Sequence, residues 1–262
     1  GEFFKENLSP YSSIYIKKGD YIIKTATNLE EVKKSLELRH KVFFNSKNID
    51  KKKCTELEWD KYDYKADHLI ILNKNLDVIG SYRLISDLFA KTFYSETEFS
   101  LDHFKNYNGL KLEVGRACVH PDFRNGVTID LLWRGILKYA QKNKIRYLFG
   151  VSSIWEKTHE EAYLLQKVME KYYGDHTFKV SASPEAFNLE NIIDTNNLKD
   201  SNTKNDKDFL KMIPALLKGY IRAGSKVCGP AIYDPSFKCH DFLTILDLNL
   251  LSPIFVRRYF KK

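Results

Sequence analysis

The sequence lacks the features of a membrane-spanning or a disulfide-rich secreted protein. Its 262 residues contain four cysteines, at positions 54, 118, 228 and 239, and none stands in a Cys-x-x-Cys pair. Such sparse cysteines are typical of reduced, packed thiols. No uninterrupted apolar run approaches the roughly 18 residues of a transmembrane helix, and the first residues lack the basic-then-apolar order of a signal peptide. We therefore expect a cytoplasmic protein, at most peripheral to the inner membrane.

Several common catalytic motifs are also missing. The seven histidines are scattered without ligand spacing, so we assign no metal site. No Gly-x-Ser-x-Gly elbow supports serine-hydrolase chemistry. Neither a Walker loop nor a Gly-x-Gly-x-x-Gly fingerprint supports nucleotide binding.

The composition is that of an ordinary globular protein, with 43% hydrophobic, 14% aromatic and 29% charged residues. The net charge of +8 predicts an acidic partner, such as an acidic carrier protein, an anionic membrane surface or nucleic acid. Composition does not choose among these, but no zinc spacing or RNA-binding aromatic motif accompanies the charge. We therefore expect no nucleic-acid partner.

Hydrophobic periodicity and capping patterns predict a mixed α/β chain. Residues 1–19 are predicted to form an N-terminal arm, and residues 20–262 a single domain with a flexible excursion at 188–208. Strands are predicted at 20–26, 67–72, 77–85, 111–119, 146–152, near 178, near 231 and at 241–248. Helices are predicted at 28–44, 127–142, 158–173, 214–222 and 253–260, with residues 90–108 as a loop containing at most one short helix. Asn28 with Glu31 and Thr158 with Glu161 are predicted to cap the first and third of these helices. Hairpins followed by strand-helix-strand units indicate a sheet with helices on its faces.

The most informative stretch is residues 112–126. An apolar strand carrying Glu113 and Arg116 leads into a Pro turn, and an Arg-Asn-Gly loop then opens the amphipathic helix at 127–142. The unsatisfied amides and the dipole of a helix N-terminus favour a phosphate. Arg124 adds a full positive charge, so this loop is predicted to bind an anion.

Three motifs follow one another in the first 155 residues. The first is Arg39-x-x-x-Phe43. The second is Glu58-Trp59-Asp60-Lys61-Tyr62-Asp63, followed by Asp67-His68-Leu69 and Gly80-Ser81-Tyr82-Arg83-Leu84. The third is Leu112-Glu113-Val114-Gly115-Arg116 with Val119-His120-Pro121-Asp122-Phe123-Arg124-Asn125-Gly126, then Leu131-Leu132-Trp133 and Leu148-Phe149-Gly150. This order resembles the GNAT superfamily of N-acyltransferases.

Within that superfamily the chain resembles most the hemolysin-like branch, which includes ornithine-acyl-carrier-protein N-acyltransferases and N-acyl amino acid synthases. The resemblance covers residues 30–155 and extends to the region 214–242. It implies a GNAT-like α/β (α+β) fold with a mixed, mostly antiparallel central sheet flanked by helices. It also implies transfer of a long-chain fatty acyl group from acyl carrier protein, or from CoA, to the α-amine of an amino acid. The product would be an N-acyl amino acid or a lyso-ornithine-type lipid.

Two other functions stay open. The Glu-x-Asp-x-x-Asp and Glu-x-x-Arg patterns also resemble acyl-homoserine-lactone synthases, which use S-adenosylmethionine. Those enzymes carry a Trp soon after the Arg-x-x-x-Phe pair, whereas residues 45–49 here contain no aromatic residue. The chain is also longer than those enzymes, so a free amino acid is the favoured acceptor. A catalytically silent acyl-carrier or membrane-binding module is the alternative of another class.

The resemblance implies an acyl-phosphopantetheine cosubstrate and no permanently bound cofactor. The backbone amides of the central strand would bind pantetheine and polarise the thioester carbonyl; these belong to Ala117, Cys118 and Val119. The phosphate would contact the side chain of Arg124 and the amides of the helix start, namely Asn125, Gly126, Val127 and Thr128. Basic residues around this loop would attract the acidic surface of an acyl carrier protein.

Glu113 is the candidate general base, because it alternates with Gly115 on one strand face; a structural ion pair with Arg116 or Arg83 is the alternative. Glu58, Asp60 and Asp63 would bind the acceptor's ammonium or position water, with Glu58 and Asp60 counted as catalytic. Their alternative is a solvated acidic loop.

The remaining candidates would hold the substrates or stabilise the fold. Arg83 and Arg116 would clamp the acceptor carboxylate, or form structural pairs, and Arg116 is also counted as catalytic. Arg39, Phe43, Ser152 and Ser153 are assigned to substrate binding, with ordinary strand-end hydroxyls as the alternative for the two serines. His120 fits a turn residue better than a catalytic one, and the stripe around Trp133 is expected in the core. The basic segment 257–262 would contact anionic lipid or be solvated.

Overall fold

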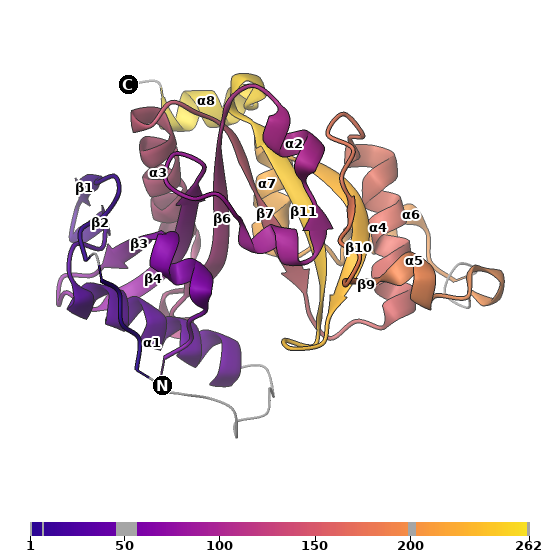
Figure 1. Ribbon diagram of the computed structural model, residues 1–262, viewed down its shortest axis with the longest axis horizontal. Coiled ribbons are helices and arrows are strands. Elements are labelled where there is room, and N and C mark those ends of the chain that lie inside the picture. Colours follow the sequence, from indigo (N-terminus) through magenta and orange to yellow (C-terminus); the bar gives the residue numbers. More distant parts are fainter. Residues whose placement is uncertain (1, 7, 46–56, 199–202, 261–262) are drawn as a thin grey trace. The chain divides into compact units, whose positions relative to one another are not determined.

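The computed structural model describes residues 2–6, 8–45, 57–198 and 203–260. The chain divides into two compact units. The first contains Gly1–Lys91 and Leu112–Ile145, and the second contains Thr92–Lys111 and Arg146–Lys262 (Figure 1). The single domain expected over residues 20–262 stays a prediction.

The first unit is built on an antiparallel sheet. Its strands pair in the order β1 (Tyr15–Lys18), β2 (Tyr21–Thr25), β3 (Asp67–Leu72), β4 (Val78–Ser86) and β6 (Leu110–Val119). Two long helices, α1 (Leu29–Asn45) and α3 (Gly126–Lys142), accompany it. A short 3-10 turn, η2 (Lys61–Lys65), precedes β3.

The two helices cover opposite faces of this sheet (Figure 1). Ile70 of β3 packs with Val32 and Leu36 of α1. The next residue back along β3, Leu69, points to the other face, since side chains alternate along a strand. There it meets α3 at Gly135, where an added Cβ would lie 2.9 Å from the Leu69 methyl carbons. Glycine at this position therefore sets how closely α3 approaches the sheet.

Side-chain caps begin both helices. The Asn28 side chain accepts a hydrogen bond from the Glu31 N–H at 2.9 Å, which confirms the predicted cap of α1. The Glu31 carboxylate accepts a hydrogen bond from the Thr27 N–H at 2.9 Å. In a capping box the donor would be the N–H of the next residue, Asn28. Asn125 caps α3 in the same way, accepting from the Thr128 N–H at 3.1 Å.

The second unit is built on a second set of antiparallel strands. They pair in the order β7 (Ile145–Ile154), β11 (Cys239–Asp247), β10 (Lys226–Asp234) and β9 (Phe187–Asn188), while β5 (Phe99–Ser100) pairs with β8 (Ser181–Ala182). The α-helices described in this unit are α2 (Asp102–Asn106), α4 (His159–Tyr173), α5 (Leu189–Ile192), α6 (Asp206–Leu210), α7 (Ala215–Ala223) and α8 (Pro253–Tyr259).

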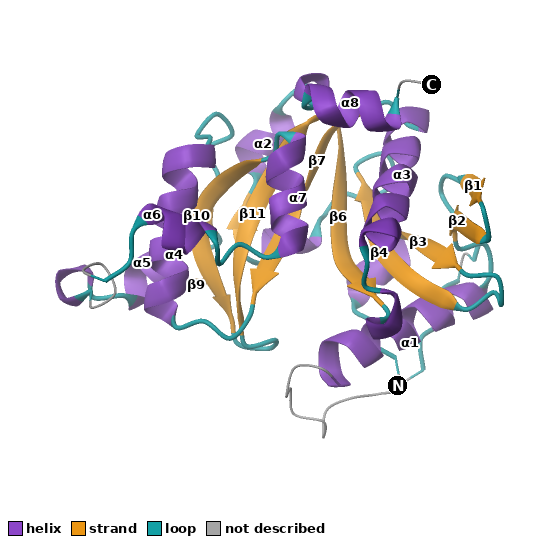
Figure 2. Ribbon diagram, turned by 180° about the vertical axis from the view of Figure 1, so that it is seen from behind, coloured by secondary structure: helices purple, strands orange, loops and turns teal. Residues whose placement is uncertain are grey.

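Helices also lie on both faces of these strands. On one face, α4 and α7 cover β10 and β11 (Figure 2) and bury Leu165, Leu217 and Phe242 in one apolar cluster. On the other face, Phe104 of α2 contacts the Phe149 ring of β7 at 5.1 Å between centroids. The predicted α/β class with mostly antiparallel strands and flanking helices is thus confirmed.

The predicted elements differ from the structure in four segments. The segment 1–19, predicted as an arm, contains the strand β1 at 15–18. The strand predicted near residue 178 is β8 at 181–182, because the Phe178 ring packs against Phe104 and Tyr147 instead of joining a ladder. The segment 90–108 contains η3 (Tyr94–Thr97) and β5 as well as α2. The excursion at 188–208 contains α5 and the start of α6, and its residues 199–202 lie outside the described part.

Within the described ranges, no helix combines the length and apolar character that crossing a bilayer would require.

Candidate active site

A β-bulge interrupts the pairing of β6 with β4. Ser81 lies opposite Cys118 and Arg83 lies opposite Gly115, so two residues of β6 face the single residue Tyr82. The first of the two, Arg116, has a left-handed backbone with φ of 51°. A bulge leaves an extra residue outside the ladder and re-aims its side chain. The amides proposed to bind the acyl donor, at 117–119, begin at this bulge.

The side chains beside the bulge form a buried ion network around Arg39 of α1. The Arg39 Nε donates to a Glu58 carboxylate oxygen at 2.7 Å, and its Nη1 donates to Asp63 at 2.5 Å. Arg39 is 1% exposed and Asp63 is 0% exposed. Burial alone would lower the pKa of Arg39, but the Asp63 and Glu58 carboxylates outweigh burial and raise it.

Two further arginines complete the network. Arg83 of β4 donates to Asp60 at 2.7 Å, and Arg116 donates to Asp60 at 3.1 Å and to Glu58 at 3.3 Å. Among these contacts of the described residues, three guanidinium groups face three carboxylates. These contacts also hold Arg116 in its left-handed conformation, which would otherwise be unfavourable.

Histidine 68 was not among the predicted site residues, although it stands within the second motif. Its Nε2 lies 2.9 Å from Asp63 Oδ1, and both groups are buried. Burial lowers the pKa of His68, which keeps the imidazole neutral and able to donate its Nε2–H. Burial would raise the pKa of Asp63, but Arg39 and Arg83 dominate and hold it well below its usual range.

Glu113 lies on the sheet face that carries this network. The register pairs Glu113 with Ile85 and Gly115 with Arg83, so these four side-chain positions share one face. Glu113 itself is buried, at 3% exposure. A Cβ placed on Gly115 would meet no heavy atom within 4 Å. Open space therefore lies next to Gly115, on the same face of β6 as Glu113.

The loop after β6 is exposed and ends at the N-terminus of α3. Pro121, Asp122, Arg124, Asn125 and Gly126 are all exposed to solvent. A Cβ on Gly126 would likewise meet no heavy atom within 4 Å, so the first turn of the helix is open. The accessible bend that the anion-binding prediction requires is present.

The side chains of this loop are tied to its own backbone and to α1. The Arg124 Nε donates to the Val119 carbonyl at 3.2 Å, and His120 accepts from the Asp122 N–H at 3.1 Å. The His120 Nε2 lies 2.9 Å from the Lys41 Nζ of α1. His120 thus stabilises the turn, as its sequence context indicated, and a lysine that the sequence did not single out stands beside the loop.

The structure brings most of the predicted site residues together in the first unit. Those that meet directly are Arg39, Glu58, Asp60, Asp63, Arg83 and Arg116. Phe43 is partly buried against an apolar cluster of Leu38 and Val42 from α1 and Cys118 from β6. Trp133 lies in the core, as expected. The acidic motif is not a solvated loop, because Glu58 and Asp63 are buried and paired.

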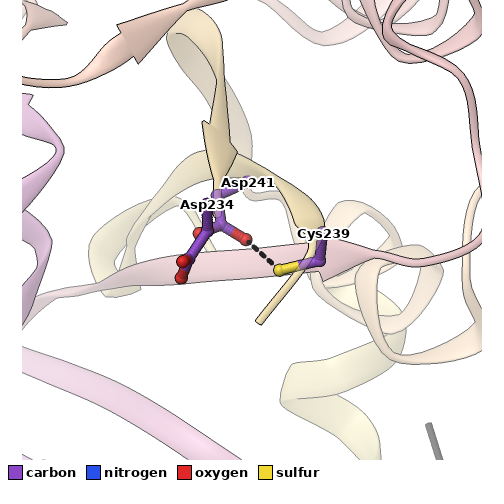
Figure 3. Close-up of side chains that lie close together, drawn as sticks. All are labelled: Asp234, Cys239 and Asp241. Carbon is purple, nitrogen blue, oxygen red and sulfur yellow. Dashed lines mark hydrogen bonds between the residues drawn. The ribbon is translucent and has the colours of Figure 1, made fainter. Parts of the chain in front are cut away.

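Ser152 and Ser153 belong to the second unit. Ser153 donates its hydroxyl to Asp241 of β11 at 2.6 Å. The Cys239 thiol donates to the same carboxylate oxygen at 3.4 Å, as Figure 3 shows. Burial raises the pKa of the Asp241 carboxyl. Asp234 accepts from the N–H groups of Ser236 and Phe237, which closes the turn between β10 and β11.

The side-chain ligand atoms of Asp234, Cys239 and Asp241 lie within 4.8 Å of one another, so their chemistry would suit a cation. Their positions are explained without one, because Asp241 is bound by two donors and Asp234 closes a turn. The absence of a metal site stays a prediction from spacing. Sequence reasoning missed this cluster because it forms only when β10 pairs with β11, which places Asp234 opposite Cys239.

Known proteins resemble this chain in sequence. The pattern of the acetyltransferase (GNAT) domain family matches residues 38–134. An L-ornithine N(alpha)-acyltransferase from Rhizobium meliloti (strain 1021) is 32% identical over 212 residues, which are 76% of this chain and 70% of the relative. A second L-ornithine N(alpha)-acyltransferase, from Brucella abortus (strain 2308), is 26% identical over 96% of each chain. A solved N-acyl amino acid synthase from uncultured soil microbes has 11% identity and a TM-score of 0.47, covering 91% of this chain and 93% of that one.

The bulged strand, the open helix start and the GNAT match define an acyltransferase of the GNAT class. The chain belongs to the same family as the Rhizobium and Brucella relatives. This family membership confirms the resemblance that the three motifs indicated. It also favours an enzyme over a catalytically silent module.

Proposed function

We propose that this enzyme transfers a long-chain fatty acyl group from acyl carrier protein to the α-amine of ornithine. The amine attacks the thioester carbonyl, the C–S bond breaks, and an amide and a free pantetheine thiol result. The acceptor is suggested by the name of the relatives, L-ornithine N(alpha)-acyltransferase. The observation that carries the proposal is the open space beside Gly115, which lies between Glu113 and the bulge on one face of β6.

The donor would lie along β6 and end at α3. The amides at and just after the bulge, at 117–119, would donate to the thioester carbonyl and stabilise the oxyanion. The pantetheine phosphate would rest on the amides of 125–128, where the helix dipole and Arg124 favour a negative charge. Lys41 and Arg124 beside this bend would attract the acidic surface of the carrier.

The acceptor would be held by the edge of the ion network. Asp60 is its most exposed carboxylate, with 26% of the side chain accessible, against 6% for Glu58 and 0% for Asp63. Asp60 would therefore bind an ammonium group of ornithine, and Arg116, at 11%, would contact the acceptor carboxylate. Glu58, Asp63, Arg39 and Arg83 would hold these two side chains in place.

Glu113 would take the proton from the attacking ammonium, directly or through one water. A buried carboxylate on the face that borders the open space is suitably placed for this role. The amine is a nucleophile only when deprotonated, so loss of this base should slow the chemical step more than binding.

The substrates are tested by incubating the protein with long-chain acyl carrier protein or acyl-CoA, each with ornithine or other amino acids. Mass spectrometry identifies the product. We expect an N-acyl-ornithine from the acyl carrier protein. A product from acyl-CoA alone would change the proposed donor, and a product from another amino acid would change the acceptor. Release of methylthioadenosine from S-adenosylmethionine would favour homoserine-lactone synthesis instead.

The base is tested with Glu113→Gln, which keeps the size of the side chain. We expect kcat to fall about 10²- to 10⁴-fold, the usual contribution of general base catalysis, with a donor KM close to that of the wild type. Glu37→Gln on the exposed side of α1 is the matched control and should leave both unchanged. Wild-type turnover in a folded Glu113→Gln variant would remove Glu113 from this role.

A further inference from the structure

A surface of the second unit combines exposed aliphatic and cationic side chains. It consists of Leu250, Ile254, Arg257, Arg258 and Phe260, which we call the apolar-basic surface. Leu250 is 74%, Ile254 68% and Phe260 41% exposed. Both arginines are exposed as well. They lie on the turn η7 (Leu248–Leu250), on helix α8 and at the residue that follows it.

This surface is fixed to the unit and is not a loose tail. The Ser252 N–H donates to the Ala223 carbonyl at the end of α7, at 2.9 Å. A Cβ on Gly224, which has a φ of 115°, would lie 3.3 Å from the Leu250 carbonyl oxygen. The close approach of these backbones requires glycine at position 224. The side chains of Leu250 and Ile254 are therefore exposed on packed backbone. Figure 2 shows the helix α8 that carries Ile254.

Ile254, Arg257 and Arg258 stand at i, i+3 and i+4 of α8 and so share one face of the helix. An exposed aliphatic side chain with two cations beside it matches the chemistry of an anionic bilayer surface. Short amphipathic helices of this kind lie in the interface with their apolar groups among the acyl chains and their cations at the headgroups. The centroid of the Tyr259 ring lies 5.7 Å from the Arg258 guanidinium carbon. Tyrosine is enriched at the membrane–water interface, where these arginines would meet the headgroups. An acidic protein would also attract the arginines, but it would offer less apolar cover for Leu250 and Ile254.

We propose that the apolar-basic surface docks this protein on the anionic leaflet of a membrane. The occupant is a bilayer containing anionic phospholipid, bound through both charge and apolar insertion. The proposal stands on the exposure and charge of this surface and does not depend on the acyl-transfer function. A vesicle-binding measurement without substrates therefore tests it separately from the enzymatic proposal.

The experiment is sedimentation of the full chain with vesicles of phosphatidylcholine, with and without phosphatidylglycerol, at low and at high salt. We expect binding to the anionic vesicles that weakens with salt. Arg257→Gln with Arg258→Gln should weaken it about fivefold per cation removed. Ile254→Ser should weaken it about tenfold, since it removes a side chain that the bilayer would cover.

Two control variants change similar groups on the first unit. Lys17→Gln with Lys18→Gln removes two exposed cations, and Leu88→Ser removes an aliphatic side chain that is 52% exposed. Both should bind anionic vesicles as the wild type does. The proposal is overturned if the wild type does not bind these vesicles, or if the controls lose as much binding as the surface variants. It is also overturned if the surface variants lose binding to acyl carrier protein but not to vesicles.

Discussion

Asp63 and His68 belong to a buried set of hydrogen-bonded side chains in the first unit. Asp63 accepts from Arg39, Arg83 and His68, and all four groups are buried. Removing one member of such a set leaves the others charged or polar without a partner, which is costly in a buried site. The network therefore fixes the position of Asp60 and Arg116, which the proposed acceptor would contact.

The neutral state of His68 predicts a pH dependence of stability. In the folded protein burial lowers the pKa of His68, whereas the unfolded chain has a pKa of about 6.5. Below that pH the unfolded state binds one more proton, so this contribution to stability is present above about pH 6.5 and is lost as pH falls. His68→Gln keeps a donor for Asp63 but does not titrate. We expect it to lose stability with falling pH less steeply than the wild type, by up to about 1.4 kcal/mol per pH unit.

Urea unfolding between about pH 6.5 and about pH 4.5 measures this difference. His240→Gln is the matched variant in the second unit, because burial and the neighbouring His159 lower the pKa of His240 to about 4. It should reduce the slope in the same direction. If the free energy of unfolding falls with pH at the same slope in His68→Gln and in the wild type, His68 binds a proton equally in the folded and unfolded states.

At the level of the element, β6 supplies three parts of the proposed site. Its residue Glu113 is the proposed base, Gly115 borders open space, and the bulge at Arg116 re-aims a guanidinium into the ion network. The strand then leads through an exposed loop into α3. One continuous segment of 17 residues from Leu110 to Gly126 therefore contains the proposed donor site and the proposed base.

A size series at Gly115 tests whether substrate occupies the open space. Gly115→Ala and Gly115→Val should fold as stably as the wild type, since a Cβ there meets nothing within 4 Å and Val suits a strand. Turnover should fall as the side chain grows, because the added methyl groups fill the space where the thioester would lie. Steady-state kinetics and urea unfolding measure the two effects. Full activity in a stable Gly115→Val variant would show that the reacting groups lie elsewhere.

Across the whole molecule, local signals predicted the long elements well. The amphipathic stripe predicted α3 to within one residue of its start, and Thr158 with Glu161 predicted the capping box of α4. The short strand β8 was predicted near residue 178 and not at 181–182, because two residues carry no periodicity and its pairing with β5 depends on contacts far along the chain. Residue 178 was misplaced because its aromatic character suited either a strand or a buried loop.

The sequence predicted which residues form the candidate site, but not how those residues are arranged. The motifs indicated which charged side chains belong together, and most of them meet in the first unit. Nothing local indicated that Glu58 and Asp63 are buried, since that depends on Arg39, which is 19 and 24 residues away. The left-handed Arg116 was also hidden, because arginine has no special preference for positive φ.

The net charge of +8 belongs to the whole chain and predicts how the enzyme would meet its donor. A cationic protein attracts an acidic carrier over a distance set by the Debye length, about 10 Å at 0.1 M salt and about 3 Å at 1 M. We therefore expect kcat/KM for acyl carrier protein to fall about tenfold as salt is raised through this range. Uncharged acyl-pantetheine is the matched donor, and its kcat/KM should change little. Equal salt dependence for both donors would place the effect on the enzyme's own stability or on the acceptor, and long-range attraction of the carrier would then be excluded.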